Sequence, residues 1–356
     1  MNRNLRKVAY FALLAAVLAV LFVAVSCKKA EKEETTPDYG SGIPAEETVK
    51  EEAKSDNDPN ITVEEAVEEE ARPDYGPSIP AEKTAPVTWA GCRRSDYGWK
   101  EAMFKREPSA EEWINYGARM GAEYEGSIPT FVWIVGSITG NEGAQRCSVN
   151  FPVEGDIEGV EDFPVDMNKA FLDMCDERGY SVWLQVEPGD CDLVSLAKAT
   201  MEYFKDRKCV KGFGVDVEWY KTQGTGGYGT KITDELAKEI DEAVKSVDPR
   251  FTVFFKHWDA GWMPPTYRSD IIFVNDSQYF KSLDSMKSFF TEWANRYYPN
   301  PVMFQIGYPA DYAVWGQLEN PKGELGALLA EDVKDGQHVG IIWVDFSLRT
   351  AMKYGK

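Results

Sequence analysis

Eight short apolar runs recur along the chain, and segments of helical periodicity separate them. The runs cover 87–91, 130–135, 181–187, 212–218, 251–256, 271–275, 302–306 and 339–344. Most are continuous rather than alternating, which is typical of parallel strands that are covered on both faces. The helical patterns lie at about 109–121, 166–178, 192–207, 233–246, 282–298 and 323–334. The chain therefore alternates predicted strands with predicted helices.

Eight strands with helical crossovers in about 270 residues predict an α/β fold, a (β/α)8 TIM-type barrel over residues 86–356. An open doubly wound sheet is the alternative. One connection departs from the pattern, because residues 257–270 contain Gly261 and Pro264-Pro265 and are too short for a full helix.

The N-terminus has the pattern of an export signal. Three basic residues precede an apolar run over 8–25, which stops at Ser26-Cys27. This arrangement predicts a lipoprotein signal peptide over 1–27, with lipidation at Cys27. An uncleaved membrane anchor is the alternative. Lys28 after the cysteine favours the outer membrane, so we expect an exported, lipid-anchored protein.

Residues 28–85 differ in composition from the rest of the chain. They hold 17 Asp or Glu against seven Lys or Arg, and their only aromatic residues are Tyr39 and Tyr75. The segment Pro-Asp-Tyr-Gly-x-x-Ile-Pro-Ala-Glu occurs twice, at 37–46 and 73–82. Such a composition predicts a disordered, self-repelling linker, and two copies are too few for a solenoid.

The formal net charge of the chain is −20. The chain is acidic and its basic residues do not cluster, which argues against nucleic acid as a partner, and we expect a monomer. Besides Cys27 there are five cysteines. Those predicted to lie in loops on one face, and so to offer a disulfide, are Cys92, Cys147 and Cys191.

Polar residues gather where the predicted strands end, which is the functional face of such barrels. The expected ligand contacts are Glu187, Trp219, Lys256, His257, Trp258, Asp276, Gln278, Gln305, Tyr308, Trp343 and Asp345. The aromatic residues among them suit stacking on sugar rings, because they lie at or after strand ends. The strand starts show no comparable enrichment.

The fourth strand carries the expected catalytic residues, Asp216 and Glu218. Residues two apart share one face of a strand, so Gly214, Asp216 and Glu218 are expected to point together. Glu218, at the strand end beside Trp219, suits a general acid. Asp216 lies deeper and suits an orienting role. A structural ion pair is the alternative for each carboxylate.

The segment Gly-Val-Asp216-Val-Glu218-Trp-Tyr resembles the fourth-strand motif of family 18 chitinases, and it is similar to the Asp-x-Glu strand of family 25 lysozymes. Trp343 and Asp345 resemble the chitinase floor tryptophan and its flanking acid. The resemblance implies a barrel glycosidase in which Glu218 protonates the leaving oxygen and Asp216 orients an acetamido group. Lys211 and Gly214 stand where chitinases have further aspartates.

Two functions follow as hypotheses. The first is a surface lipoprotein that hydrolyses glycosidic bonds of a polysaccharide, including amino-sugar glycans as a possible substrate class. A glycosidase with two catalytic carboxylates would take the second from Glu187 or Asp276, because the seventh strand offers Gln305 instead of an acid. The second hypothesis is a barrel that binds carbohydrate without cleaving it. No metal or cofactor is expected, because the two histidines lie on different strands.

Overall fold

The computed structural model describes residues 87–102 and 104–354. The signal peptide, the lipidation site Cys27 and the linker with its duplicated segment all lie outside the described residues, so those expectations stay predictions. Among the described residues, no helix is long and apolar enough to cross a membrane.

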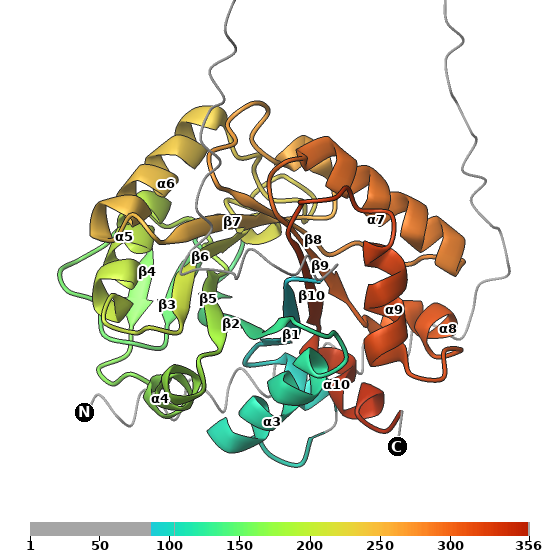
Figure 1. The fold of residues 1–356 in the computed structure, drawn as a ribbon. Coiled ribbons are helices and arrows are strands. Elements are labelled where there is room, and N and C mark those ends of the chain that lie inside the picture. Colours follow the sequence, from blue (N-terminus) through green and yellow to red (C-terminus); the bar gives the residue numbers. More distant parts are fainter. Residues whose placement is uncertain (1–86, 103, 355–356) are drawn as a thin grey trace, which may run out of the picture. The chain divides into compact units, whose positions relative to one another are not determined.

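Eight parallel strands close into a barrel (Figure 1). The barrel strands are β1 (Trp89–Arg94), β2 (Ile128–Thr139), β5 (Ser181–Val186), β6 (Val210–Asp216), β7 (Thr252–Lys256), β8 (Ile272–Asn275), β9 (Val302–Ile306) and β10 (Val339–Trp343). Each strand pairs with the next in sequence order, and β1 closes the barrel by pairing with both β2 and β10. The predicted (β/α)8 barrel is confirmed.

Helices lie around the strands in the predicted order (Figure 1). The main ones are α3 (Ala110–Gly121), α4 (Lys169–Arg178), α5 (Leu193–Phe204), α6 (Asp234–Val247), α7 (Leu283–Tyr297) and α9 (Pro321–Ala330). Shorter helices are α2 (Gly98–Glu101), α8 (Tyr312–Trp315) and α10 (Asp345–Ala351). Between β7 and β8 lies only the 3-10 turn η3 (Ala260–Trp262), as the short connection predicted.

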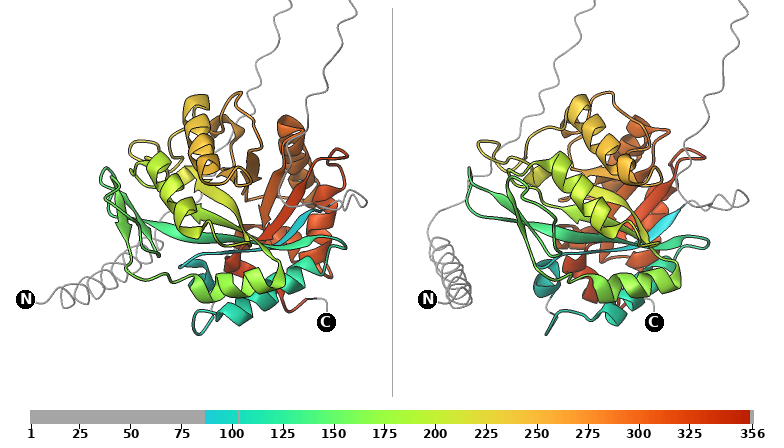
Figure 2. Two further views of the ribbon diagram at one scale, coloured as in Figure 1. Left: turned by 60° about the vertical axis from the view of Figure 1, so that its left-hand side comes forward. Right: turned by 90° about the vertical axis from the view of Figure 1, so that its left-hand side faces the viewer.

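A small extension of the sheet was not predicted. After leaving the barrel, β2 pairs antiparallel with β3 (Arg146–Val149), which pairs in turn with β4 (Val160–Asp162). The three strands project from one side of the barrel (Figure 2). The short and partly polar sequences of β3 and β4 explain why the apolar pattern did not reveal them.

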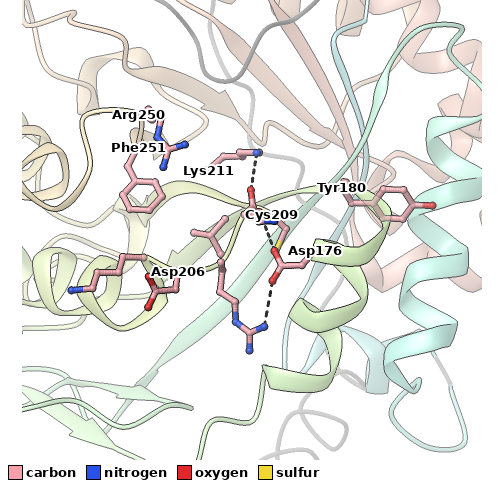
Figure 3. A pocket seen from close by; sticks show the side chains of 12 residues that line it. Asp176, Tyr180, Asp206, Cys209, Lys211, Arg250 and Phe251 are labelled. Atoms are coloured by element: carbon pink, nitrogen blue, oxygen red, sulfur yellow. Dashed lines mark hydrogen bonds and ion pairs between the residues drawn. The ribbon is translucent and has the colours of Figure 1, made fainter.

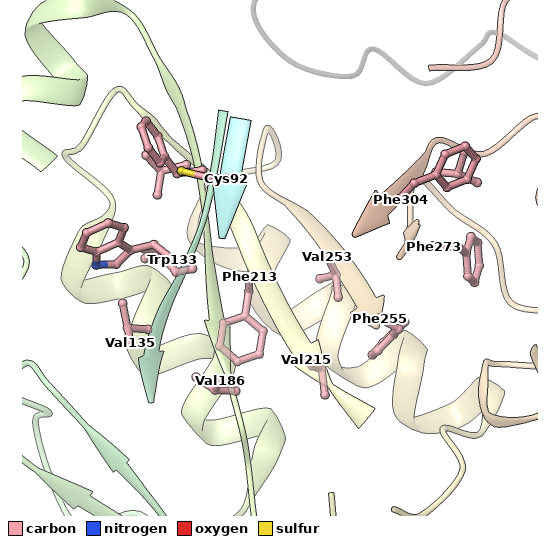
Figure 4. Packing of buried hydrophobic residues seen from close by; sticks show 14 of the residues in the cluster. Cys92, Trp133, Val135, Val186, Phe213, Val215, Val253, Phe255, Phe273 and Phe304 are labelled. Carbon is pink, nitrogen blue, oxygen red and sulfur yellow. The ribbon is translucent and has the colours of Figure 1, made fainter. Parts of the chain in front are cut away.

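The barrel strands separate two apolar layers. Inside the barrel a small cluster holds one side chain or more from most strands, including Trp89, Trp183 and Phe254. The larger cluster lies between strands and helices and includes Phe213 and Val215 (Figure 4). Gly214 faces the interior, because a Cβ there would lie 2.0 Å from the ring of Phe254. The predicted alternation along β6 is confirmed as far as Asp216.

The cysteines differ from the expectation of a disulfide. All five within the described residues are buried free thiols. Cys92 lies in β1 and Cys147 in β3, so the prediction that both lie in loops was wrong. Both thiols pack in the apolar cluster between the strands and the helices.

Candidate functional site

Polar side chains fill the end of the barrel where the strands finish. Deeper in the barrel, the interior faces of the strands carry the small apolar cluster. Because side chains alternate between the two faces of a strand, the next inward-pointing position along a strand carries a polar side chain. The members of this polar layer are Arg93, Gln185, Asp216, Lys256 and Gln305, and all are buried. The strand ends thus carry a polar layer above an apolar one.

Lys256 is the centre of this layer. It ends β7, and its Nζ lies 3.1 Å from Oδ1 of Asp216 and 2.9 Å from Oε1 of Glu218. Asp276, which follows β8, also forms an ion pair with Nζ. Burial opposes the charge of Lys256, but the three carboxylates outweigh it and hold its pKa well above the usual range. One ammonium therefore faces three carboxylates.

Asp216 lies beneath the surface of this cluster. Only 1% of it is exposed, and its Oδ2 accepts a hydrogen bond of 2.9 Å from Nε2 of Gln185. Burial raises the pKa of Asp216 well above its usual range; Lys256 opposes the rise, while the carboxylates of Glu218 and Asp276 add to it. Asp216 therefore suits the holding of a proton or the positioning of Lys256.

Glu218 does not lie on the strand as predicted. The strand ends at Asp216, and Glu218 belongs to the 3-10 turn η2 (Val217–Trp219). Its side chain is 22% exposed and still reaches Lys256. Glu218 is thus the member of the cluster that is most open to solvent.

A pocket of about 440 Å³ opens beside the cluster. Its lining consists of Glu218, Trp258, Asp276, Ser277, Gln278, Tyr279, Phe280 and Phe289. Two carboxylates and several aromatic rings therefore share one cavity. This combination of charge and ring surface suits a sugar, which offers hydroxyl groups and apolar ring faces.

Several buried polar atoms near the mouth have no hydrogen-bond partner among the described residues. They include Oδ1 of Asp276, Oε1 of Gln185, Nδ2 of Asn275 and Nε2 of Gln305. Leaving such groups unpaired costs about 1–3 kcal/mol each. Their concentration at one end of the barrel indicates a place for water or a polar ligand.

Glu187, which follows β5, is held by two donors. The Tyr97 hydroxyl donates to Oε1 at 2.6 Å, and the Ile138 amide donates to Oε2 at 3.2 Å. Burial raises the pKa of Glu187 above its usual value, against the effect of these hydrogen bonds. Tyr97 carries no signal in the sequence beyond its position after the first strand.

Because its pKa is raised on folding, Glu187 stabilises the protein fully below its unfolded pKa of about 4.3. That contribution is lost as the pH rises through the higher folded pKa. We expect Glu187→Gln to make the decline in the free energy of unfolding above pH 4.3 shallower, measured by urea titration at several pH values. Glu177→Gln, on the exposed face of α4, is the matched control. An unchanged slope in Glu187→Gln would contradict this assignment.

His257 supports the rim of the mouth. Its ring stacks on Trp258 at 4.0 Å and on Trp262 at 5.2 Å between centroids. Nδ1 accepts a hydrogen bond from the Asp259 amide, and Nε2 lies 3.0 Å from the Tyr228 carbonyl oxygen. Burial lowers the pKa of His257. Both ring nitrogens of His257 are thus engaged within the protein, and neither is free for the predicted contact with a ligand. The ring instead positions Trp258 and the rim.

The other predicted contacts are two buried polar residues and two tryptophans. Tyr308 is buried with its hydroxyl 3.4 Å from Oε1 of Gln305, and Asp345 is fully buried in a pair with Arg93 at 2.8 Å. Trp219 is 36% exposed but does not line the pocket. The prediction for Trp343 was wrong. This residue is fully buried and packs against Trp315 at 5.3 Å between centroids, in the layer between strands and helices.

Some members of the site were missed. Tyr279, Phe280 and Phe289 line the pocket, and Phe289 lies on α7, far in sequence from Glu218. Within the described part of the chain, no group of three or more His, Cys, Asp or Glu side chains could hold a metal ion. The carboxylates of the mouth surround Lys256 instead.

No family model and no curated protein matches the chain. Solved structures of similar fold include an endo-beta-mannanase/endo-beta-glucanase of Prevotella bryantii, with TM-score 0.44, 10% identity and coverage of 74% of this chain and 48% of that one. The chain thus spans about half the length of that protein.

A GH5-4 endoglucanase from an uncultured bacterium matches with TM-score 0.39 and 12% identity, covering 76% of this chain and 95% of that one. A beta-1,4-D-mannanase from Cryptopygus antarcticus matches with TM-score 0.40 and 12% identity, covering 75% and 89%. None of the three is named as a family 18 chitinase or family 25 lysozyme, and that resemblance stays a prediction. Similarities this low carry no argument about function.

Proposed function

We propose that this barrel is a glycoside hydrolase that cleaves a polysaccharide in the pocket beside Lys256. The observation that carries the proposal is the pair of carboxylates from Glu218 and Asp276, which line one pocket and bind one ammonium group. Two carboxylates at one sugar-sized cavity are the groups that glycosidic hydrolysis requires.

The two carboxylates differ in ways that suit different roles. Glu218 is the more open of the two, with 22% of its side chain exposed, and it acts as the general acid. Asp276 is 3% exposed and forms an ion pair with Lys256, while its Oδ1 has no protein partner and is free to reach a substrate. In the first step Asp276 attacks the anomeric carbon as Glu218 protonates the leaving oxygen. Water then releases the sugar, giving its proton to Glu218.

Asp216 takes a different role from the one that the chitinase resemblance implies. It does not line the pocket, and it contacts Gln185 and Lys256. It therefore positions Lys256 rather than touching an acetamido group. This arrangement favours two catalytic carboxylates over substrate assistance.

The spacing of the two carboxylates favours a retaining mechanism. Two oxygens that bind one nitrogen at ordinary hydrogen-bond length lie within about 6 Å of each other. Retaining enzymes have carboxyl groups about 5–5.5 Å apart, whereas inverting enzymes need about 6.5–9.5 Å. We expect the first product of cleavage to keep the anomeric configuration of the substrate, as followed by proton NMR. Inversion in the first turnover would contradict the role of Asp276 as the nucleophile.

A barrel that binds a glycan without cleaving it is the second candidate. Two observations favour it. The seventh barrel strand, β9, has Gln305 at a position where a catalytic carboxylate could lie, and Glu218 is held in an ion pair with Lys256. We further propose that the protein is exported and anchored to the cell envelope through Cys27, which the N-terminal sequence supports.

A further inference from the structure

A second cavity has a volume of about 700 Å³, and its lining side chains are drawn in Figure 3. Most of its lining residues lie shortly before three neighbouring strands, β5, β6 and β7, and two are the first residues of β6, so the cavity lies where strands begin. The pocket beside Lys256 lies where strands end. The two cavities are therefore separate sites.

The charge of this second cavity is opposite to that of the chain as a whole. Five cationic side chains line it, from Lys205, Arg207, Lys208, Lys211 and Arg250, against the two acids Asp176 and Asp206. The whole chain, by contrast, has 59 acidic and 39 basic residues. Four of the five cations fall within seven consecutive residues, so the expectation that basic residues do not cluster was wrong.

Three of these cations have carboxylate partners. Lys205 pairs with Glu202 at 3.2 Å, Arg207 pairs with two aspartates of α4, and Arg250 pairs with Asp248. Neither Lys208 nor Lys211 has an ion pair with a carboxylate among the described residues. These two lysines therefore lack a direct carboxylate contact, although Asp176 lines the same cavity.

Lys211 is the most constrained of the five. It is half-buried, and its Nζ donates to the carbonyl oxygen of Lys208 at 2.9 Å. Burial lowers the pKa of Lys211 and the nearby guanidinium of Arg250 adds to that effect, while the carboxylate of Asp176 opposes it. Figure 3 shows Lys211 and Arg250 close together, with Phe251 beside the arginine. An anion between the two cations would remove their repulsion and replace lost hydration.

We propose that this cavity binds a segment of an anionic polysaccharide through the carboxylate or sulfate groups of its sugars. The guanidinium and ammonium groups provide charge-assisted hydrogen bonds, and the half-buried ring of Tyr180 adds apolar surface to the lining. The basic lining is confined to one cavity on an acidic protein, which disfavours the long, uniform charge of a nucleic acid. The site would hold the polymer to the protein without cleaving it.

The test is calorimetric titration of the full chain with polygalacturonate at low salt. We expect the wild-type protein to bind it, and the double variant Lys208→Gln/Lys211→Gln to bind roughly tenfold more weakly or worse. The matched control is Lys198→Gln/Lys238→Gln, which removes the same charge from exposed positions on α5 and α6 outside the cavity. The control should bind like the wild type, and equal thermal midpoints confirm that all three proteins are folded.

Three results would overturn this proposal: no binding of polygalacturonate, equal binding of fully methyl-esterified polygalacturonate, or tighter binding of polyphosphate. The first two remove the role of the carboxylates, and the third assigns the cavity to phosphate. The Glu218→Gln protein should bind polygalacturonate like the wild type, because its substitution lies at the other end of the barrel. Binding without hydrolysis would thus support this site even if the proposed enzymatic function failed.

Discussion

Replacing Lys256 by methionine is expected to lower the free energy of unfolding by about 3–5 kcal/mol. The ammonium group is 1% exposed and contacts Asp216, Glu218 and Asp276. Methionine has a similar length but no charge, so the variant keeps the packing and leaves three carboxylates without a cation. Urea titration at neutral pH measures the loss.

A second substitution separates charge from packing. In the double variant Lys256→Met/Asp276→Asn one of the unneutralised carboxylates is gone, so part of the lost stability should return. Lys198→Met, on the exposed face of α5, should change stability little. A loss below about 1 kcal/mol in Lys256→Met, the level of an exposed ion pair, would show that the cluster is not held by this charge.

Glu218→Gln is expected to lower the rate of glycan hydrolysis by about 10²–10⁴-fold, the usual contribution of a general acid. The amide has the shape of the carboxyl group, and its oxygen still accepts a hydrogen bond from Lys256, but it cannot deliver a proton. Because Trp258 and the other lining residues are unchanged, glycan affinity should stay close to that of the wild type. Initial rates and calorimetric affinities on the same glycan test both expectations.

The control for this variant is Glu177→Gln, which makes the same chemical change on α4, away from the pocket. It should hydrolyse the glycan like the wild type. If Glu218→Gln retained full activity, the general acid would have to be another group, and Glu187 would be the first to examine.

The fold was predictable because each barrel strand is a separate apolar run and the main helices between them show apolar residues at helical spacing. The polar layer was predictable for a related reason. Alternation along β6 and β7 places Asp216 and Lys256 on the interior face, and both are buried there. The same alternation would have excluded Trp343 from the mouth, because its neighbour Ile342 belongs to the interior cluster. Its likeness to a motif tryptophan was the weaker guide.

The contacts within the site were not predictable, because they join residues from different strands. The sequence offered an ion pair as an alternative role for Glu218 without its partner, and only the closed barrel brings Glu218 and Asp276 to the ammonium group of Lys256. Glu218 lies beyond the end of β6, so the strand rule no longer applies to it. The cavity at the strand starts combines the loop before β6 with Arg250, a contact that no local pattern indicates.

The release of reducing ends from a panel of polysaccharides tests the central claim most directly, with the Glu218→Gln protein as the paired blank. The proposed function predicts that the wild-type protein releases reducing ends from at least one glycan, and that the variant binds the same glycan with hydrolysis lowered by about 10²-fold or more. Equal binding by both proteins with no release from any glycan would contradict the enzyme and leave a barrel that only binds carbohydrate.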